Sequence, residues 1–331
     1  MSQYNGLLIV DKPGKMNHDG SAPPTTEAEP AGAKQKLPTS HDIVQQVRRW
    51  SKERRIGHTG TLDPMASGVL VLCLGAATRL VEYYQRHDKQ YYAEIVLGAA
   101  TDTYDAMGRI TQRAPIPQLD EAPIECALAQ FRGEVQQIPP VYSALKVQGE
   151  SLHRKARRGE TVALSPRPVT FHKLELLAIA PPNRICLRIL CSAGAYVRSL
   201  AHDLGQALHS YAHLDILRRE QAGPFTLADA HTMPQIESAI QEQRFADLLL
   251  PPGARLDLPQ LTLDAETHTR LGFGQKTPIV TGPPPADGLA QAYTADGHFA
   301  GIIRCLGFAQ ETDTANPATI WKAEKWFNTE S

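Results

Sequence analysis

Hydrophobic residues are gathered in short runs and in alternating stretches, both of which are typical of β-strands. Residues 6–10 form an uninterrupted apolar run that stops at an Asp-Lys-Pro-Gly turn, which predicts a short buried strand. Between residues 185 and 191, large apolar residues recur at every second position, the spacing of a half-buried strand. We predict strands at 6–10, 68–75, 91–97, 170–180 and 185–191.

Apolar residues three and four positions apart predict helices between these strands. Ser40 is a suitable N-cap for a helix whose apolar face carries Ile43 and Val47. Thr78 is expected to cap a second helix in the same way. We predict helices after Ser40, after Thr78, over 120–132 and over 197–208.

Two stretches interrupt this pattern and indicate how the chain is organised. Residues 17–38 are rich in Pro, Ala, Gly, Thr and Glu and almost lack large apolar side chains, so we expect a flexible insertion there. The sequence Pro-Pro-Gly at 251–253 is the clearest boundary, because short strand-like runs follow it. We therefore expect an α+β domain over residues 1–250 and a small, mostly β domain over 251–331.

Composition narrows the class of protein. The 331 residues are 42% hydrophobic and 21% charged, which excludes a globally disordered chain. The net charge is −1, but residues 241–331 carry 7 basic and 11 acidic residues, so the first 240 residues are net basic. The five cysteines include no CxxC pair, which argues against a disulfide scaffold or a thiolate metal site. No signal sequence or membrane span is evident, so we expect a soluble, cytoplasmic protein.

The segment from residue 57 to residue 68 is the best candidate for chemistry. Three glycines and one proline shape a tight loop directly before a predicted buried strand, a position that often carries catalytic residues. Asp63 precedes Pro64, which restricts its backbone and thus the direction of its carboxylate. From the residues alone, Asp63 is either a catalytic acid or the closing residue of an Asx turn.

The stretch GHTGTLDPMASGVLVLCLGAAT, residues 57–78, resembles the signature of the TruB-type pseudouridine synthases. These enzymes isomerise a uridine in the T-arm of transfer RNA. Further matching pieces follow in the family's order: 6–13 (GLLIVDKP), 39–49 (TSHDIVQQVRR), 88–91 (DKQY), 98–105 (GAATDTYD), 138–146 (IPPVYSALK), 191–198 (CSAGAYVR) and 217–219 (LRR). The match covers residues 6–16 and 39–225 almost continuously. Residues 17–38 depart from it, because the family usually runs from DKPxGM straight into TS.

The resemblance implies both a fold and an activity. The expected catalytic domain has a mixed, largely antiparallel sheet with flanking helices and an active site in a cleft across the sheet. A small PUA-like RNA-binding domain is expected after residue 250. The implied activity is that of a tRNA pseudouridine synthase acting on the T-loop uridine at position 55. The implied partner is the T-arm of tRNA, and we expect a monomer that needs no membrane and no obligatory protein partner.

The resemblance also assigns roles to individual residues. It implies that Asp63 is the catalytic carboxylate and that Arg198 is the cation beside it. It places Tyr91 against the target base, Tyr196 near that base and Leu217 in an apolar wall. Each of the last four residues also has a plain structural interpretation, as a surface arginine or as core and sheet-face packing. Isomerisation consumes no redox equivalent, so no cofactor and no metal are expected.

A uridine stacked in an RNA loop has to be flipped out of the stack to reach a buried carboxylate. The resemblance assigns His58 to the space that the flipped base vacates. Phosphate contacts are expected from two groups of basic residues: Arg48, Arg49, Lys52, Arg54 and Arg55, and Lys146, Arg154, Lys155, Arg157 and Arg158.

Three other interpretations stay open on the sequence. The chain could be an RNA-folding chaperone with an inert pocket, or a relative that depends on a guide RNA and partner proteins. It could also be a carboxylate hydrolase acting on a glycosidic bond, although the motif region offers no second placed acid.

Overall fold

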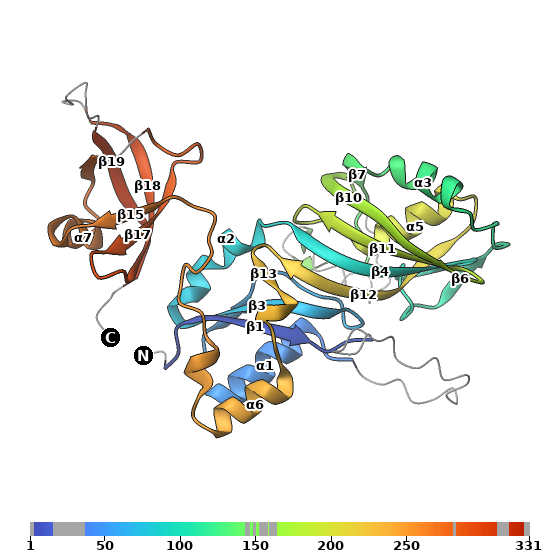
Figure 1. The fold of residues 1–331 in the computed structure, drawn as a ribbon, viewed down its shortest axis with the longest axis horizontal. Coiled ribbons are helices and arrows are strands. Elements are labelled where there is room, and N and C mark those ends of the chain that lie inside the picture. The colour runs from blue at the N-terminus through green and yellow to red at the C-terminus, as the bar shows by residue number, and fades with distance from the viewer. Residues whose placement is uncertain are drawn as a thin grey trace.

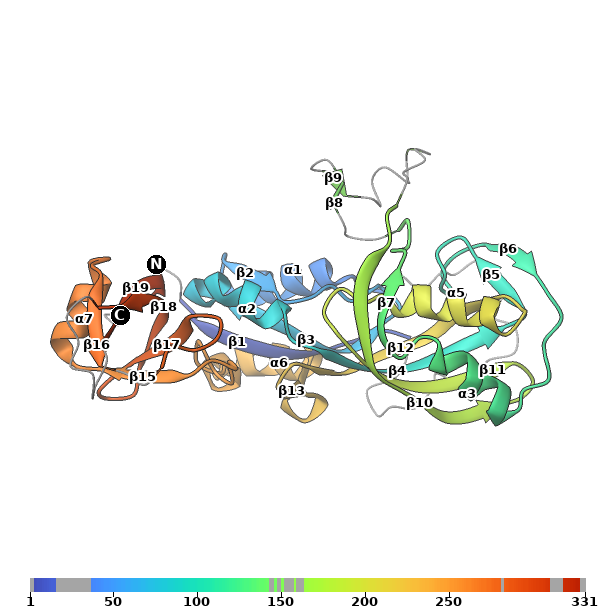
Figure 2. The ribbon, with the colours of Figure 1, turned by 90° about the horizontal axis from the view of Figure 1, so that it is seen from above.

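The computed structural model describes residues 3–15, 37–142, 146–147, 150–151, 158, 164–280, 283–309 and 318–327. A ten-stranded sheet dominates the described chain, and a separate five-stranded sheet lies at one end of the molecule (Figures 1 and 2). The strands of the larger sheet are β1 (Gly6–Lys12), β2 (Ile56–His58), β3 (Ser67–Leu74), β4 (Lys89–Leu97), β7 (Gly133–Gln137), β10 (Arg167–Ala180), β11 (Arg184–Cys191), β12 (Ala212–Ala222), β13 (Phe225–Thr226) and β14 (His231–Thr232).

The other elements are short. The helices are α1 (Ser40–Ser51), α2 (Val81–Gln85), α3 (Glu121–Ala129), α5 (Val197–Ala207), α6 (Met233–Gln241) and α7 (Ala265–Gly272), with the 3-10 helices η1 (Gly75–Leu80), η2 (Leu227–Asp229) and η3 (Phe245–Leu248). The remaining strands are β5 (Ala99–Thr101), β6 (Ile110–Arg113), β8 (Lys146–Val147), β9 (Glu150–Ser151), β15 (Gln260–Leu263), β16 (Thr277–Val280), β17 (Leu289–Thr294), β18 (Phe299–Phe308) and β19 (Ala318–Trp326).

The larger sheet is mixed and largely antiparallel, as the sequence predicts. Its main order is β14-β1-β3-β12-β4-β11-β10-β7, with β2 and β13 paired at the side. Only the pairs β1–β14 and β3–β12 run parallel. The parallel β3–β12 pair brings the start of β3, which follows the Asp63 loop, beside Arg218 and Arg219 of β12.

Helices cover one face of this sheet along its length. Alternate residues of β1, β3, β4 and β11 form one core cluster with apolar side chains of α1, α3, α5 and α6. The opposite face of the β1–β3 half packs against η1, α2 and apolar residues of the five-stranded sheet, including Leu289 of β17 and Ile302 of β18. The continuous burial of β1 and β3 explains their uninterrupted apolar runs.

The five-stranded sheet has the order β15-β17-β18-β19-β16 and its own small core around Trp321 and Leu271. Figure 1 shows it in orange and red, beyond α2. Leu250 exchanges two backbone hydrogen bonds with Leu7 of β1, at 2.8 and 2.9 Å, so backbone bonding to the larger sheet extends to residue 250. The expected division of the chain at this point, and a PUA-like character of the second part, stay predictions.

The cap of α1 differs from the prediction. Thr39, not Ser40, is the N-cap: its side chain accepts from the Asp42 backbone N–H, and Asp42 reaches back to Thr39 in a capping box. Ser40 is the first helical residue and is buried. Its hydroxyl bonds both the N–H (2.8 Å) and the carbonyl (3.0 Å) of Leu62, which ties α1 to the residue before Asp63.

The predicted cap at Thr78 is also wrong. Thr78 lies inside η1, where its hydroxyl donates to the carbonyl of Gly75 at 2.7 Å, and α2 starts only at Val81. The expected insertion at 17–38 falls outside the described residues apart from 37 and 38, and Leu37 packs against the main core. Among the helices of the described residues, none combines the length and the apolar character needed to cross a bilayer.

Candidate active site

Asp63 sits in the loop between β2 and β3, and the loop is fixed from two sides. Ser40 holds Leu62, as described above. On the other side, the carbonyl of Asp63 accepts from the N–H of Ala66 at 3.0 Å, which closes the turn over Pro64. The backbone that carries the carboxylate is therefore held independently of any ligand.

A buried lysine beneath this loop supplies a further support. Lys12, at the end of β1, has no exposed surface, and its ammonium group donates to the carbonyl oxygens of Pro13 (2.9 Å), Pro64 (3.1 Å) and Ala66 (2.7 Å). Burial lowers the pKa of Lys12 to about 8, although the charge of Asp63 acts in the opposite direction. This explains why β1 continues through Lys12 instead of ending at Val10: a lysine with three acceptors can be buried.

Arg198 holds the carboxylate of Asp63 directly. Its Nη2 donates to Oδ1 at 3.0 Å and its Nε lies 2.9 Å from Oδ2, so both carboxylate oxygens face the guanidinium. The side chain of Arg198 is 5% exposed and that of Asp63 is 29% exposed. The acid thus opens to the pocket while the cation beside it is buried; the resemblance implies the neighbouring arginine but not this difference in burial.

Three further groups keep Arg198 in place. Its Nη1 donates to the carbonyl of Thr103 at 3.1 Å, and its Nη2 donates to the carbonyl of Tyr142 at 2.9 Å. Asp105, also buried, lies 3.5 Å from Nη1. Arg198 therefore bridges two carboxylates at the first turn of α5, where the helix dipole favours negative charge.

The groups around Asp63 shift the pKa of its carboxyl in opposite directions. Burial raises the pKa of the Asp63 carboxyl above its ordinary value, and the charge of Asp105 adds to this effect. The charge and hydrogen bond of Arg198 and the charge of Lys12 favour the ionised form. The site thus contains a carboxylate in a water-poor setting whose charge depends on its arginine.

These groups border a pocket of about 400 Å³, within the size range of small-ligand sites of roughly 300–1,000 Å³. It is lined by Thr59, Gly60, Thr61, Leu62, Asp63, Gln85, Lys89, Tyr91, Ser192, Gly194, Ala195, Tyr196, Val197, Arg198, Leu217 and Arg219. Asp63, Tyr91, Tyr196, Arg198 and Leu217, which the sequence analysis singled out, all contribute. They come from a loop, two strands and the start of one helix.

The pairing of β4 with β12 positions two of these residues. Tyr91 faces Arg219 and Ala93 faces Leu217 in the register, so Tyr91 and Leu217 share one wall. Burial raises the pKa of the Tyr91 hydroxyl, while the charge of Arg219 and a hydrogen bond from it favour the ionised form. Tyr91 is therefore a neutral phenol with an apolar ring beside the acid.

Tyr196 is the N-cap residue of α5, not a strand residue. Its backbone N–H donates to the side-chain oxygen of Gln137 at 2.8 Å, and its carbonyl accepts from the Gln137 side-chain nitrogen at 3.0 Å. These two hydrogen bonds to Gln137 of β7 fix the turn that brings both Tyr196 and Arg198 to the pocket.

Two cations of the pocket were not assigned by sequence reasoning. Lys89 opens β4, and its ammonium group donates to the carbonyl oxygens of Gln85 (2.6 Å) and His87. Arg219 of β12 donates through Nε to the carbonyl of Val69 at 2.6 Å and through Nη2 to the carbonyl of Gly60 at 3.1 Å. Both stand in pieces that match the family, DKQY and LRR, which is the signal that could have identified them.

His58 is the one singled-out residue that does not line the pocket. It lies in β2, opposite Leu72, and its Nδ1 is buried without a hydrogen-bond partner among the described residues. Burial, and then the nearby charges of Arg219 and His41, lower the pKa of His58. The neutral imidazole stands beside the pocket, and its expected part in base flipping stays a prediction.

The structure describes the first of the two expected basic groups and very little of the second. Of the first, Lys52, Arg54 and Arg55 are exposed in the segment from α1 to β2, and Arg48 donates to the carbonyl of Arg54 at 3.1 Å. The second group lies outside the described residues except for an exposed Arg158 and the backbone of Lys146. Within the described part of the chain, no cluster of His, Cys, Asp and Glu is arranged to hold a metal ion.

Comparisons with known proteins agree on the pseudouridine synthases as the class of protein. The N-terminal domain of the TruB family of pseudouridylate synthases matches residues 48–197, and the C-terminal domain of tRNA pseudouridylate synthase B matches residues 198–256. The tRNA pseudouridine synthase B of Dehalococcoides mccartyi is 42% identical over 86% of this chain and 92% of its own length. That of Xanthomonas campestris pv. campestris strain B100 is 38% identical over 90% and 89%.

Solved structures extend the likeness to the fold. A chain in an H/ACA RNP bound to a substrate RNA containing 2'-deoxyuridine superposes with a TM-score of 0.69 at 21% identity, over 98% of this chain and 85% of that one. A chain of a Cbf5-Nop10-Gar1 complex gives 0.67 at 24% identity, over 98% and 94%. Fold and sequence together place the protein among the pseudouridine synthases. The chain belongs to the TruB family.

Proposed function

We propose that this protein is a stand-alone tRNA pseudouridine synthase that converts the T-loop uridine at position 55 of tRNA to pseudouridine. The observation that carries the proposal is Asp63, held by Arg198 and open to a pocket of nucleoside size. The relatives named tRNA pseudouridine synthase B, which match over most of both chains, supply the substrate class.

The isomerisation needs few chemical groups, and residues of the pocket can supply them. The bond from ribose C1′ to base N1 breaks, the base turns, and C1′ joins C5, whose hydrogen leaves as a proton while N1 regains one. Atoms and electrons balance without any cofactor or metal. One carboxylate near the sugar or the base suffices, and Asp63 can act as a nucleophile or as the base of an elimination. The charge of Arg198 favours the ionised form of Asp63 and opposes the burial that raises the pKa of its carboxyl.

The other lining residues have roles that follow from their chemistry. Tyr91 and Leu217 form a flat aromatic and apolar wall on which a flipped uracil stacks, replacing the stacking lost when it leaves the RNA, a cost of a few kcal/mol. Tyr196 closes the pocket next to Arg198. We assign to His58, which is uncharged because burial lowers its pKa, the role of filling the gap that the uridine leaves in the RNA.

The remaining expectations concern assembly. We propose that residues 1–250 form the catalytic domain and that residues 251–331 form a PUA-like domain that extends the RNA surface. Since the relatives that match over most of both chains are named tRNA pseudouridine synthase B, we propose a monomer that works in the cytoplasm without an obligatory protein partner. The H/ACA structures share the fold at below 25% identity and therefore carry no argument for a guide RNA.

Mapping pseudouridine in an unmodified tRNA transcript after incubation with the purified chain alone tests the proposal. The expected product is a single pseudouridine at position 55. A transcript with cytidine at that position is the matched control and should stay unmodified. Modification only after addition of a guide RNA would refute stand-alone action, and pseudouridine at another position would refute the assigned site. Light scattering of the same preparation tests the monomer.

A further inference from the structure

Two buried cations line the pocket, and neither has a carboxylate within ion-pair distance among the described residues, although the charge of Asp88 acts on Lys89. Lys89 is 8% exposed and Arg219 is 2% exposed, and both face the pocket that contains Asp63. Their acceptors are backbone carbonyl oxygens and, for Arg219, also the Tyr91 hydroxyl, and each of these oxygens carries only a partial charge. Neither forms an ion pair with any carboxylate of the residues that the structure describes.

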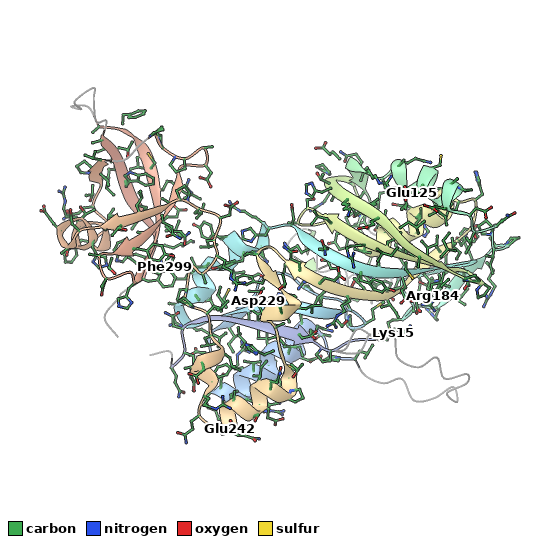
Figure 3. All side chains as sticks on the ribbon, in the orientation of Figure 1. Lys15, Glu125, Arg184, Asp229, Glu242 and Phe299 are labelled. Atoms are coloured by element: carbon green, nitrogen blue, oxygen red, sulfur yellow. The ribbon has the colours of Figure 1, made fainter. Side chains whose placement is uncertain are left out.

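Comparable arginines in or beside the same sheet do have acidic partners: Arg218 and Arg184 lie in β12 and β11, and Arg198 lies in α5. The pairs are Arg198 with Asp63 at 2.9 Å, Arg218 with Asp11 at 3.0 Å and Arg184 with Asp215 at 2.7 Å. Figure 3 labels Arg184 and Lys15, which lie near each other and share Asp215. Even Arg184, which is partly exposed, is paired with an acid, whereas the buried Lys89 and Arg219 have no acidic partner among the described residues.

Counting donor hydrogens separates these two residues from the other buried lysine. An ammonium group has three, and Lys12 gives all of them to carbonyl oxygens. Lys89 gives two, so one has no acceptor among the described residues. Arg219 has five, gives two to carbonyl oxygens, and is also bonded to Tyr91. Both cations therefore keep donors for a ligand in the pocket.

We propose that Lys89 and Arg219 bind a phosphate group of the RNA backbone next to the uridine that enters the pocket. The inference rests on the proposed function and adds a binding site to it. Two adjacent buried positive charges call for an anion, and the uracil carbonyl groups are neutral. A phosphodiester supplies the charge, and it matches a lysine point charge and an arginine fork. The phosphate would fix the nucleotide from the side of β4 and β12.

The titration of Lys89 is consistent with this site. Burial, and then the charge of Arg219, lower the pKa of Lys89 to about 8, so its positive charge is held weakly in the free protein. A phosphate beside it would favour the charged form and offset part of the cost of burial.

A double-mutant cycle between protein and RNA tests the site. Binding of a synthetic T-arm stem-loop is measured in the Asp63→Asn background, so that the RNA is not consumed. Each phosphodiester of the loop is replaced in turn by an uncharged methylphosphonate. We expect replacement at one linkage flanking the target uridine to weaken binding about tenfold with Lys89 present and less than about twofold in Lys89→Met.

The controls make each outcome decisive. Lys322→Met removes an exposed lysine of β19, and it should leave the cost of every methylphosphonate unchanged. If Lys89→Met does not fold, Lys89→Gln and Arg219→Gln provide the same cycle, each checked by thermal unfolding. Equal methylphosphonate costs with and without Lys89, or coupling only at a linkage remote from the target, would overturn the proposal. Isomerisation of tRNA by the unaltered protein is scored separately, so a failed cycle does not count against the proposed function.

Discussion

Asp63 and Arg198 are 135 residues apart in the chain, and the guanidinium faces both carboxylate oxygens, at 3.0 and 2.9 Å. The pair is asymmetric: the arginine is buried and further bonded to backbone carbonyl oxygens, whereas the acid opens to the pocket. Arg198 is thus a fixed support and Asp63 is the group that a substrate meets. This asymmetry leads to different predictions for the two residues.

Asp63→Asn is expected to abolish pseudouridine formation while RNA still binds. The amide keeps the size of the side chain but cannot act as a nucleophile or as a base. Tritium release from labelled tRNA measures turnover, and filter binding measures affinity. Turnover within about tenfold of the unaltered protein would show that another group does the chemistry.

Arg198 substitutions should act through the charge state of Asp63. Arg198→Met leaves two carboxylates unpaired, so we expect a loss of about 3–5 kcal/mol in the free energy of unfolding. The pKa of Asp63, already raised by burial, rises further without its cation. Because the reaction needs the ionised acid, the acidic limb of the pH–rate profile should move to higher pH. Arg198→Lys, which keeps the charge, should shift this limb less, and an unchanged limb in both variants would contradict the assigned role.

The sequence predicted five of the ten strands of the larger sheet, namely β1, β3, β4, β10 and β11, because their signals are local, but it did not predict the central strand β12. Uninterrupted apolar runs mark β1 and β3, which are buried on both faces, and alternation marks β11. The helix cap was misplaced by one residue because Thr39 and Ser40 are both good cap residues. Asp42, three residues after Thr39, was the available signal for the capping box.

The glycines and proline of its loop made Asp63 a candidate from the residues alone, but the other site residues could be predicted only through the family resemblance. No local pattern relates Asp63 to Arg198 or Leu217, since strand pairing and the start of α5 bring them together. Lys89 and Arg219 were not assigned to the site from the sequence for the same reason. Each is an ordinary charged residue of a strand, and only the β4–β12 pairing shows that both are buried at one pocket.

Neighbouring hydroxyls at the start of α1 should separate stability from activity. Thr39→Ala removes the helix cap and should cost about 1 kcal/mol in the free energy of unfolding, with the turnover rate unchanged. Ser40→Ala leaves the backbone of Leu62 without its partners, at a cost of about 1–3 kcal/mol, and frees the loop that carries Asp63. Only Ser40→Ala should therefore lower the turnover rate. Urea unfolding and single-turnover assays measure the two effects, and equal kinetic losses would argue against this division.

Gly68 should tolerate no side chain, because it lies where β3 meets β12. Its φ is +100°, and a Cβ there would lie 2.3 Å from the carbonyl oxygen of Arg219. Gly68→Ala adds backbone strain to this clash, so we expect a loss of about 2–5 kcal/mol in the free energy of unfolding. Gly133→Ala is the matched control, with φ at +86° and no atom within 4 Å, and should cost only about 1 kcal/mol. Similar losses by chemical denaturation would show that the clash is relieved.

RNA affinity should depend on pH through Lys89. Its pKa in the free protein is lowered to about 8, and a bound phosphate should raise it. Binding then takes up a proton above pH 8, so affinity falls as the pH rises beyond that point, by at most about tenfold per unit. Lys89→Arg stays charged and should bind RNA with no such decline, whereas Lys89→Met should bind weakly at every pH. Fluorescence titrations from pH 6.5 to 9.5 at constant ionic strength distinguish these cases. A decline that persists in Lys89→Arg would assign the titration to another group, with Lys12 the next to test because its pKa is also about 8.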